Sequence, residues 1–256
     1  MKVWYTVADW TARRRELAGS RIGFVPTMGA LHRGHASLVE RCRAENQVAV
    51  VSIFVNPAQF NDRRDLERYP RTLETDLSLL EALGTDEVFV PAAGEIYPEG
   101  RRFRVEEDCL TRVMEGAYRP GFFNGVMTVV LKLLHLVQPE RAYLGEKDYQ
   151  QLRVIDAMVR DFFLATEIVA CGTVRETSGL AESSRNALLS PAGRDKAASL
   201  FRSLSEAPDP AAARSLLERE GFQVDYVEEH WGRRFGAASI EGVRLIDNVP
   251  LACGGR

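Results

Sequence analysis

The segment 48–55, VAVVSIFV, constrains the fold most strongly, because it is almost wholly apolar and rich in β-branched residues. Such a strand is typical of a sheet whose two faces are both covered. Further short apolar runs lie at 22–26 and 87–90. Segments with apolar residues at helical spacing separate the three runs, at 36–46 and 72–83. Strand and helix therefore alternate, which predicts right-handed crossovers and a parallel sheet.

The remaining elements continue this pattern up to about residue 173. The sequence predicts strands at Arg101–Val105, Ala142–Leu144 and Glu167–Cys171, and helices at Val126–Val137 (with His135 in the core) and Asp148–Phe162. Beyond residue 173, SEAPDP at 205–210 is typical of a linker between two helices, and a strand follows at Val224–Val227. We therefore expect an α/β fold: a Rossmann-like parallel sheet with helices on both faces in residues 1–173, and a small α+β domain in residues 174–256.

Composition and charge exclude several classes of protein. The 33 basic and 36 acidic residues give a net charge of −3, which argues against a polynucleotide partner because phosphate binding needs a basic excess. No apolar run approaches the ~18 residues of a membrane-spanning helix, and the N-terminus lacks a signal-peptide pattern. We therefore expect no membrane partner and a cytoplasmic location. Four scattered cysteines without metal-site spacing, Cys42, Cys109, Cys171 and Cys253, are expected to be reduced thiols.

The most informative motif is His32-Arg33-Gly34-His35, between the first predicted strand and the first predicted helix. Ligands of parallel sheets bind beyond the carboxyl ends of the strands, and a helix N-terminus attracts phosphate. Gly34 has no Cβ, so an anion can approach its backbone. If the segment is helical, both imidazoles lie on one face and can reach the same anion. The alternative, two surface histidines in a turn, is weakened by the position after the first strand.

The segment 145–151, GEKDYQQ, is another predicted junction between a strand and a helix. Lys147 offers a mobile positive charge for phosphate, and Asp148 can accept hydrogen bonds from ribose or hold a metal. Gln151 can bind a polar substrate. Taken alone, the segment also fits an ordinary solvated turn.

Two further segments carry polar side chains suited to binding. Ser183, Ser184 and Arg185 could clamp a polyphosphate, because arginine pairs with phosphate through two parallel bonds. A helix N-cap explains the serines equally well. The segment 56–60, NPAQF, follows the second strand, and its amides could select a carbonyl or a hydroxyl.

Taken together, these motifs closely resemble the pantothenate synthetase (pantoate–β-alanine ligase) family, of the nucleotidyltransferase superfamily with the H-x-G-H signature. The resemblance covers roughly residues 22–190 and RLIDN at 244–248. It rests on PTMGALHRGH (26–35), SIFVNPAQF (52–60), YP (69–70), IYP (96–98), RPG (119–121), LGEKDYQQL (144–152), TVRE (173–176) and GLAESSRN (179–186).

The resemblance implies a role for each matching position. Catalysis would involve His32, His35, Lys147 and Arg185. The ATP site would include Met28, Gly29, His32, Gly34, His35, Gly145, Lys147, Asp148, Val174, Glu182, Ser183, Ser184 and Arg185. Gln59 and Gln151 would bind pantoate, with Asn56 nearby and Phe122 in the region that faces the acid and amine.

The implied activity is ATP-dependent condensation of pantoate with β-alanine through an acyl-adenylate, with release of AMP and pyrophosphate. The positive groups and Mg²⁺ would neutralise the triphosphate, so ATP and Mg²⁺ are expected without a resident protein metal site. The resemblance also implies a homodimer and a C-terminal lid, which looks shortened at 230–239.

Three positions depart from the family pattern: Phe122 replaces a histidine, Ser178 an aspartate, and Glu182 a leucine or methionine. Losing a hydrogen-bonding group beside the substrates can change selectivity by orders of magnitude. Three alternatives therefore stay open. They are a related ligase for another hydroxy acid or amine, a paralogue that binds nucleotide without catalysis, and a nucleotidyltransferase acting on RNA, which the acidic balance disfavours.

Overall fold

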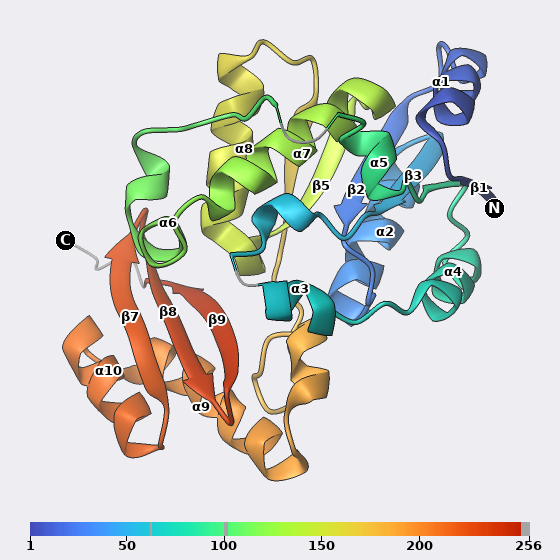
Figure 1. Cartoon of the computed structure of the whole chain (residues 1–256). Helices are drawn as coiled ribbons and strands as arrows, with labels where there is room; N and C mark the ends of the chain where they lie inside the picture. The colour runs from blue at the N-terminus through green and yellow to red at the C-terminus, as the bar shows by residue number, and fades with distance from the viewer. Residues whose placement is uncertain (62, 100–101, 252–256) are drawn as a thin grey trace. The chain divides into compact units, whose positions relative to one another are not determined.

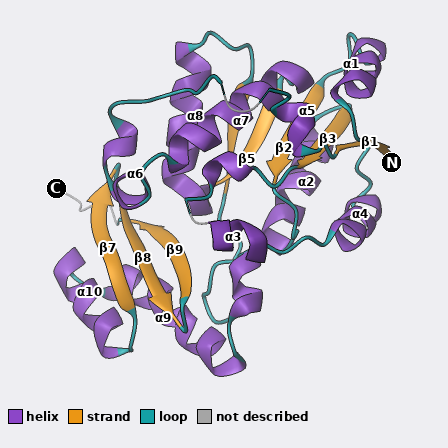
Figure 2. Cartoon of the chain, viewed as in Figure 1, coloured by secondary structure: helices purple, strands orange, loops and turns teal. Residues whose placement is uncertain are grey.

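A computed structural model of the chain describes residues 1–61, 63–99 and 102–251 (Figures 1 and 2). By its internal contacts the chain divides into two compact units. The first comprises Met1–Glu146 and Gln150–Cys171, and the second Lys147–Tyr149 and Gly172–Arg256. A boundary between independently folding domains at residue 173 stays a prediction.

A parallel sheet, six-stranded within the described residues, forms the centre of the first unit. Its order is β1-β4-β3-β2-β5-β6. The strands are β1 Lys2–Trp4, β2 Ile22–Thr27, β3 Val48–Ile53, β4 Glu87–Phe89, β5 Arg141–Gly145 and β6 Glu167–Cys171. Because β2 leads to β3 and β4 on one side while β5 and β6 lie on the other, the strand order reverses between β2 and β5. This reversal is where ligands bind in such sheets.

Helices cover both faces of this sheet, as the doubly apolar strands predict. On β2, Phe24 packs with α1 (Val7–Glu16), α7 (Phe122–Val137) and α8 (Tyr149–Asp161). The next residue, Val25, packs with α2 (Arg33–Glu45) and α4 (Leu73–Ala82). Successive side chains of a strand point to opposite faces, so one strand contributes to both cores. The predicted Rossmann-like α/β fold is confirmed.

Two predictions for the first unit are wrong. Residues 102–105 form no strand, and Arg101 lies outside the described residues. Instead of joining a sheet edge, Val105 donates its backbone N–H to Thr128 Oγ1 of α7 at 3.0 Å. His135 is exposed rather than buried, because the packed face of α7 is formed by neighbours such as Leu133, Leu134 and Val137.

Short helices connect the main elements of the first unit. They are η1 Pro57–Gln59, α3 Arg63–Arg68, α5 Ala93–Ile96, η2 Leu110–Arg112, α6 Met114–Tyr118 and η3 Glu146–Asp148, the last of which spans the boundary between the units.

The second unit contains an antiparallel sheet of order β7-β8-β9, within the described residues, and two helices. Its elements are η4 Ser184–Leu188, α9 Pro191–Glu206, α10 Pro210–Arg219, β7 Gln223–His230, β8 Arg233–Ile240 and β9 Val243–Pro250. Ser190 and Asp209 cap α9 and α10, each with proline at the first helical position. The predicted small α+β part is confirmed, although the sequence patterns indicated only β7 among its strands.

Candidate active site

The candidate residues of the first unit follow three neighbouring strands at their carboxyl ends. The H-x-G-H segment follows β2, Asn56 and Gln59 follow β3, and Gly145 ends β5. These strands are adjacent, because β2 pairs with β3 on one side and with β5 on the other. All three loops therefore emerge at the reversal point of the sheet, where a nucleotide site is expected.

A buried carboxylate holds the loop between β2 and α2. The side chain of Asp76, on α4, is 2% exposed and accepts backbone N–H bonds from Ala30 at 2.9 Å and Leu31 at 2.8 Å. Gly29 has φ +77° and Ala30 has φ +49°, so two consecutive residues are left-handed. The bonds to Asp76 offset this conformational cost and fix the approach to the histidines.

Gly29 is the residue whose backbone most restricts substitution in this loop. A Cβ there would lie 2.9 Å from Asp76 Oδ2 and 3.1 Å from Ile53 Cγ2, in a left-handed conformation. We expect Gly29→Ala to lower the free energy of unfolding by about 1–3 kcal/mol. Gly94→Ala is the matched control, because a Cβ at Gly94 meets nothing within 4 Å. Urea denaturation of both variants measures the effect, and equal losses would contradict it.

His32 and His35 form the N-terminus of α2, which begins three residues earlier than the sequence pattern indicated. His32 is the N-cap residue, and its Nδ1 accepts from Gly34 N at 3.1 Å. His35 Nδ1 accepts from His32 N at 3.4 Å, which completes a reciprocal capping box. The ring centroids lie 4.1 Å apart. The prediction that the two imidazoles lie together is confirmed.

These hydrogen bonds define the chemistry that the histidines can perform. A ring nitrogen that accepts a hydrogen bond carries no proton, so each neutral ring has its proton on Nε2. The Nδ1 atoms serve the helix, and an imidazole Nε2–H group is a donor of the kind that suits an anionic ligand. The N-terminus of α2 adds its positive dipole end to the same region.

The amides after β3 form a buried cluster. Asn56 is 1% exposed, and its Nδ2 donates to Gln59 Oε1 at 3.0 Å and to Gly125 O at 3.1 Å. Its Oδ1 accepts from Tyr97 Oη at 2.9 Å and from Ala58 N at 3.2 Å. Gln59 Nε2 in turn contacts Met28 Sδ at 2.8 Å. The amide of Asn56 is therefore engaged internally, and one of its hydrogen bonds goes to Gln59.

Phe122, which stands where the family pattern has histidine, begins α7. The guanidinium of Arg119 lies 3.8 Å from the centre of its ring, and Arg119 donates to Gln59 O at 3.3 Å. Arg119 also pairs with the buried Glu115 at 3.5 Å. Phe122 thus forms a stacking platform for a cation beside Gln59.

Gln151, the other residue expected to bind the acid, lies on α8 and is partly buried.

A carboxylate of low pKa holds the loop that precedes these residues. Burial raises the pKa of Glu107, but backbone N–H bonds from Leu110, Thr111 and Cys109, at 2.8–2.9 Å, outweigh burial and leave the pKa below its usual value. A group of this kind stabilises the fold above its unfolded pKa of about 4.3 and loses that effect as pH falls through its folded pKa.

Glu107→Gln should therefore destabilise the protein at pH 6, and the difference from wild type should shrink as pH falls below about 4. Urea denaturation of both proteins between pH 6 and pH 3 measures it. A difference that stays constant with pH would mean that the charge of Glu107 contributes nothing.

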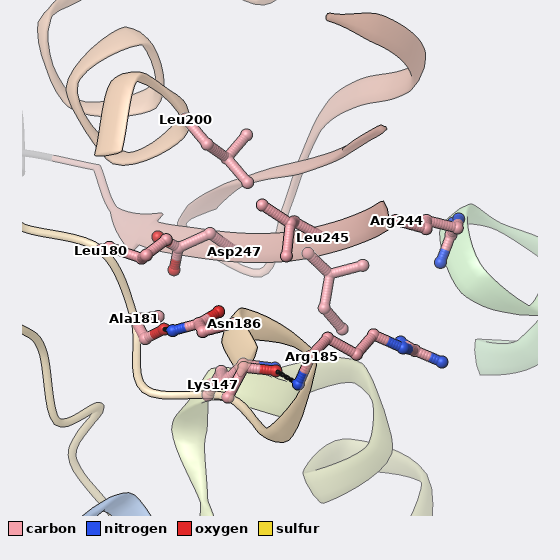
Figure 3. A pocket seen from close by; sticks show the side chains of 11 residues that line it. Lys147, Leu180, Ala181, Arg185, Asn186, Leu200, Arg244, Leu245 and Asp247 are labelled. Atoms are coloured by element: carbon pink, nitrogen blue, oxygen red, sulfur yellow. Dashed lines mark hydrogen bonds between the residues drawn. The ribbon is translucent and has the colours of Figure 1, made fainter. Parts of the chain in front are cut away.

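In the second unit, candidate residues line one small recess (Figure 3). Lys147, Ser183 and Arg185 lie along it, as do Asn186 and Asp247. In Figure 3, Lys147, Arg185 and Asn186 face residues of β9 across the recess. Lys147 Nζ lies 3.4 Å from Asp148 Oδ1. The recess thus has two cationic side chains and the hydroxyl of Ser183 along it, and their binding of one phosphate group stays a prediction.

The segment 183–186 contains the N-cap that the sequence allowed, while the polyphosphate clamp stays a prediction. Ser183 is an N-cap, because its Oγ accepts from Arg185 N at 3.3 Å at the start of η4. Asn186 is 4% exposed and donates to Glu176 Oε1 and Ala181 O. Its Oδ1 is buried and has no hydrogen-bond partner among the described residues.

Val174 and Glu182 are held by a backbone link. Glu182 N donates to Val174 O at 2.9 Å, and Arg175 forms an isolated bridge with Ala181. Arg175 binds the buried Asp247 through two bonds of 2.6 and 2.9 Å. The predicted nucleotide-binding segments 173–176 and 179–186 are thus joined to each other and to β9.

Sequence reasoning missed several residues that build these sites. Asp76, Asn186 and Asp247 were given no role, although Asn186 and Asp247 lie in quoted motifs. The partners of Asp76 are 45 and 46 residues away, so no local spacing could reveal them. Among the described residues, no group of three or more His, Cys, Asp or Glu side chains could hold a metal ion. No helix in the described ranges is long and apolar enough to cross a membrane.

The cysteines of the described ranges, Cys42, Cys109 and Cys171, are free, and Cys253 lies outside those ranges. Burial raises the pKa of the Cys42 thiol to about 12, and burial also raises that of Cys171. Both are therefore protonated at neutral pH and make poor nucleophiles.

Comparison with known proteins gives a consistent result. The profile of the family described as Pantoate-beta-alanine ligase matches residues 2–250. The pantothenate synthetase of Bdellovibrio bacteriovorus is 48% identical over 244 residues, which cover 95% of this chain and 97% of the relative.

Solved structures of this family also resemble the chain closely. The pantoate-beta-alanine ligase of Francisella tularensis, complexed with Beta-gamma ATP and Beta-alanine, has a TM-score of 0.94 at 40% identity and covers 98% of this chain and 97% of its own. The pantothenate synthetase of Thermus thermophilus has a TM-score of 0.90 at 46% identity, with 98% and 99% covered. With the loops at the sheet reversal, these matches establish that the chain belongs to the pantoate–β-alanine ligase family.

Proposed function

We propose that this protein condenses pantoate with β-alanine, using ATP and releasing AMP and pyrophosphate. The observation that carries the proposal is the pair His32 and His35 at the N-terminus of α2, at the reversal point of the sheet. The names of the relatives support the substrates, and the Francisella complex with Beta-gamma ATP and Beta-alanine supports ATP and the amine.

The reaction would proceed through an acyl-adenylate. A carboxylate oxygen of the acid attacks the α-phosphorus of ATP, and the bond from that phosphorus to pyrophosphate breaks. The amine then attacks the acyl carbon, AMP leaves, and the amine loses a proton. Repulsion between the carboxylate and the triphosphate is the first obstacle. The Nε2–H groups of His32 and His35 and the dipole of α2 would stabilise the developing negative charge.

We assign Lys147 and Arg185 to the binding of ATP phosphates. Their place in one recess with Ser183 supports a phosphate role, since arginine and lysine supply most of the charge in such sites. Met28, Gly29, Gly34 and Gly145 would contact ATP through the loops at the strand ends. Asp148, Val174, Glu182 and Ser184 would complete its binding.

Gln59 and Gln151 are proposed to bind the acid. Their amides can donate to its carboxylate and accept from its hydroxyl groups. Asn56 supports Gln59 rather than binding substrate itself, and Phe122 stacks under Arg119. This arrangement retains a cation beside Gln59 in the absence of the family histidine.

Mg²⁺ is proposed to enter with ATP. Mg²⁺ in nucleotide sites is commonly held by phosphates and one or two carboxylates. Asp148 would offer it a carboxylate, and the ion would supply charge neutralisation of the phosphates.

The finer assignments of location and assembly are also proposals. An ATP-consuming reaction and buried protonated thiols suit the cytoplasm. Family membership supports a homodimer, for which light scattering should give twice the mass of the chain. A single-chain mass at micromolar concentration would contradict it.

Exchange of labelled pyrophosphate into ATP tests the first half-reaction. We expect exchange with wild-type protein only when pantoate is present, and pantothenate when β-alanine is added. Exchange with another hydroxy acid alone would overturn the proposal in favour of a related ligase. Absence of exchange with any acid would overturn it in favour of a nucleotide-binding paralogue.

A further inference from the structure

The β9 residue Asn248 lies in an unusual set of contacts within the second unit. It is 1% exposed, and its Nδ2 donates to the backbone carbonyl of Lys147 at 2.9 Å. Its Oδ1 accepts from Arg233 Nε of β8 at 2.5 Å. Both ends of this buried amide are therefore hydrogen-bonded. Its N–H group donates to the backbone of Lys147, the residue to which we assign phosphate binding.

The strand places Asn248 and its neighbour Asp247 on opposite faces, because successive side chains of a strand alternate. Asp247 lines the recess and holds Arg175. Asn248 points away from that pair toward the segment 147–149. One strand therefore contributes to the recess directly through Asp247 and indirectly through Asn248.

The segment 147–149 rests on a surface made by three residues of β8 and β9, which we call the Asn248 seat: Arg233, Phe235 and Asn248. Asn248 and Phe235 are partners in the strand register. The ring of Phe235 lies 6.1 Å from that of Tyr149, and the guanidinium of Arg233 lies 4.5 Å from the centre of the Tyr149 ring. The seat thus contacts both ends of the segment.

This arrangement matters because a lysine is a flexible side chain that carries a point charge. Its four-carbon stem gives the ammonium group many positions, so its backbone must be fixed to restrict them. Lys147 lies in η3, a three-residue turn of 3₁₀ helix, which has little rigidity of its own. The bond from Asn248 ties the carbonyl of Lys147 to the sheet.

We propose that Asn248 is a positioning residue for Lys147, and that the Asn248 seat sets where the Lys147 ammonium meets the triphosphate. The proposal rests on the proposed function, in which Lys147 binds ATP. A misplacement of about 1 Å at a reacting centre can lower a rate about 100-fold, so loss of the tether should affect catalysis more than folding.

The test is a double-mutant cycle in the full chain with Asn248→Asp and Lys147→Met. Asp at position 248 keeps an acceptor for Arg233 but cannot donate to the Lys147 carbonyl. ATP affinity is measured by calorimetry, and kcat and KM by pantoate-dependent pyrophosphate exchange. We expect Asn248→Asp to lower kcat/KM for ATP by about 10- to 100-fold.

The double variant separates positioning from a general structural role. If Asn248 acts through Lys147, adding Asn248→Asp to Lys147→Met should cost less than about threefold further. Losses that multiply in the double variant would overturn the proposal. Glu228→Gln on β7, which replaces the carboxylate beside His230 with a neutral amide, is the matched control and should leave kcat/KM unchanged.

A second variant covers the case in which Asn248→Asp does not fold. Arg233→Gln leaves Asn248 in place but removes the guanidinium that orients it, and we expect a loss of about 10-fold that is again absent in the Lys147→Met background. Equal losses in both backgrounds would overturn the proposal.

The two readouts distinguish this proposal from the proposed function. Suppose that wild-type protein binds ATP and that the effects of Asn248→Asp and Lys147→Met on ATP affinity are not additive. The positioning role of Asn248 is then supported, even when pantoate supports no exchange. If exchange is normal and the two effects are additive, the positioning role of Asn248 is wrong while the proposed function stands. Failure of wild-type protein to bind ATP would overturn both.

Discussion

Replacing His35 with glutamine should lower the rate of pantoate-dependent pyrophosphate exchange by about 10²- to 10³-fold. Glutamine at the third helical position can still accept from the backbone N–H of His32, as in the usual capping box. The variant therefore keeps the start of α2 while losing the imidazole Nε2–H. The loss should appear mainly in kcat, because the lost donor acts where charge develops in the transition state.

The matched control is His135→Gln on α7, which replaces an exposed histidine in the same unit. It should retain wild-type exchange. Thermal unfolding of both variants should remain within a few degrees of wild type. If His35→Gln retains full activity, the assignment of His35 to the triphosphate is wrong.

Replacing Asp247 with alanine should have the largest effect on stability, a loss of about 3–5 kcal/mol in the free energy of unfolding. The side chain of Asp247 is 3% exposed and that of Arg175 is 20% exposed, so removal of the carboxylate leaves a largely buried guanidinium unpaired. Arg175 also lies 4.0 Å from the centre of the Phe201 ring, which limits its movement toward water. Urea denaturation of the full chain measures the effect.

Asp225→Ala provides the comparison for an ion pair on the same sheet. Asp225 pairs with Arg244 at 2.7 Å, but the two side chains are 34% and 23% exposed. Water can solvate the remaining charge when one partner of such an exposed pair is removed, so the expected loss in the free energy of unfolding is about 1 kcal/mol or less. Similar losses for Asp247→Ala and Asp225→Ala would show that burial of the Arg175 pair contributes nothing extra.

The main strands and helices of the first unit could be predicted because their signals are local. The apolar runs of β2 and β3 and the helical spacing in α2 and α7 are each contained within one element. A strand that is buried on both faces of a sheet is apolar throughout in any protein, so the apolar runs alone indicated β2 and β3. The isolated apolar residues near Val105 had no such support, and the strand predicted there is absent.

The strands β8 and β9 were missed because their residues alternate weakly and β8 is rich in small side chains. A signal was nevertheless present in the two-residue connections, Trp231-Gly232 and Glu241-Gly242. All four residues have positive φ, as type I′ hairpin turns require. An X-Gly pair between two short runs would have indicated both hairpins.

The sequence by itself determined the alternation of strand and helix, the family, and the loops in which the H-x-G-H and G-E-K-D motifs lie. The roles of the site residues stay predictions. Only the tertiary structure decided that Asp76 holds the loop before His32, that Asn56 is engaged by Tyr97 and Gln59, and that Asn248 binds Lys147. The physical reason is that a hydrogen bond depends on distance in space, and packing joins residues that are far apart along the chain, 101 positions in the case of Lys147 and Asn248.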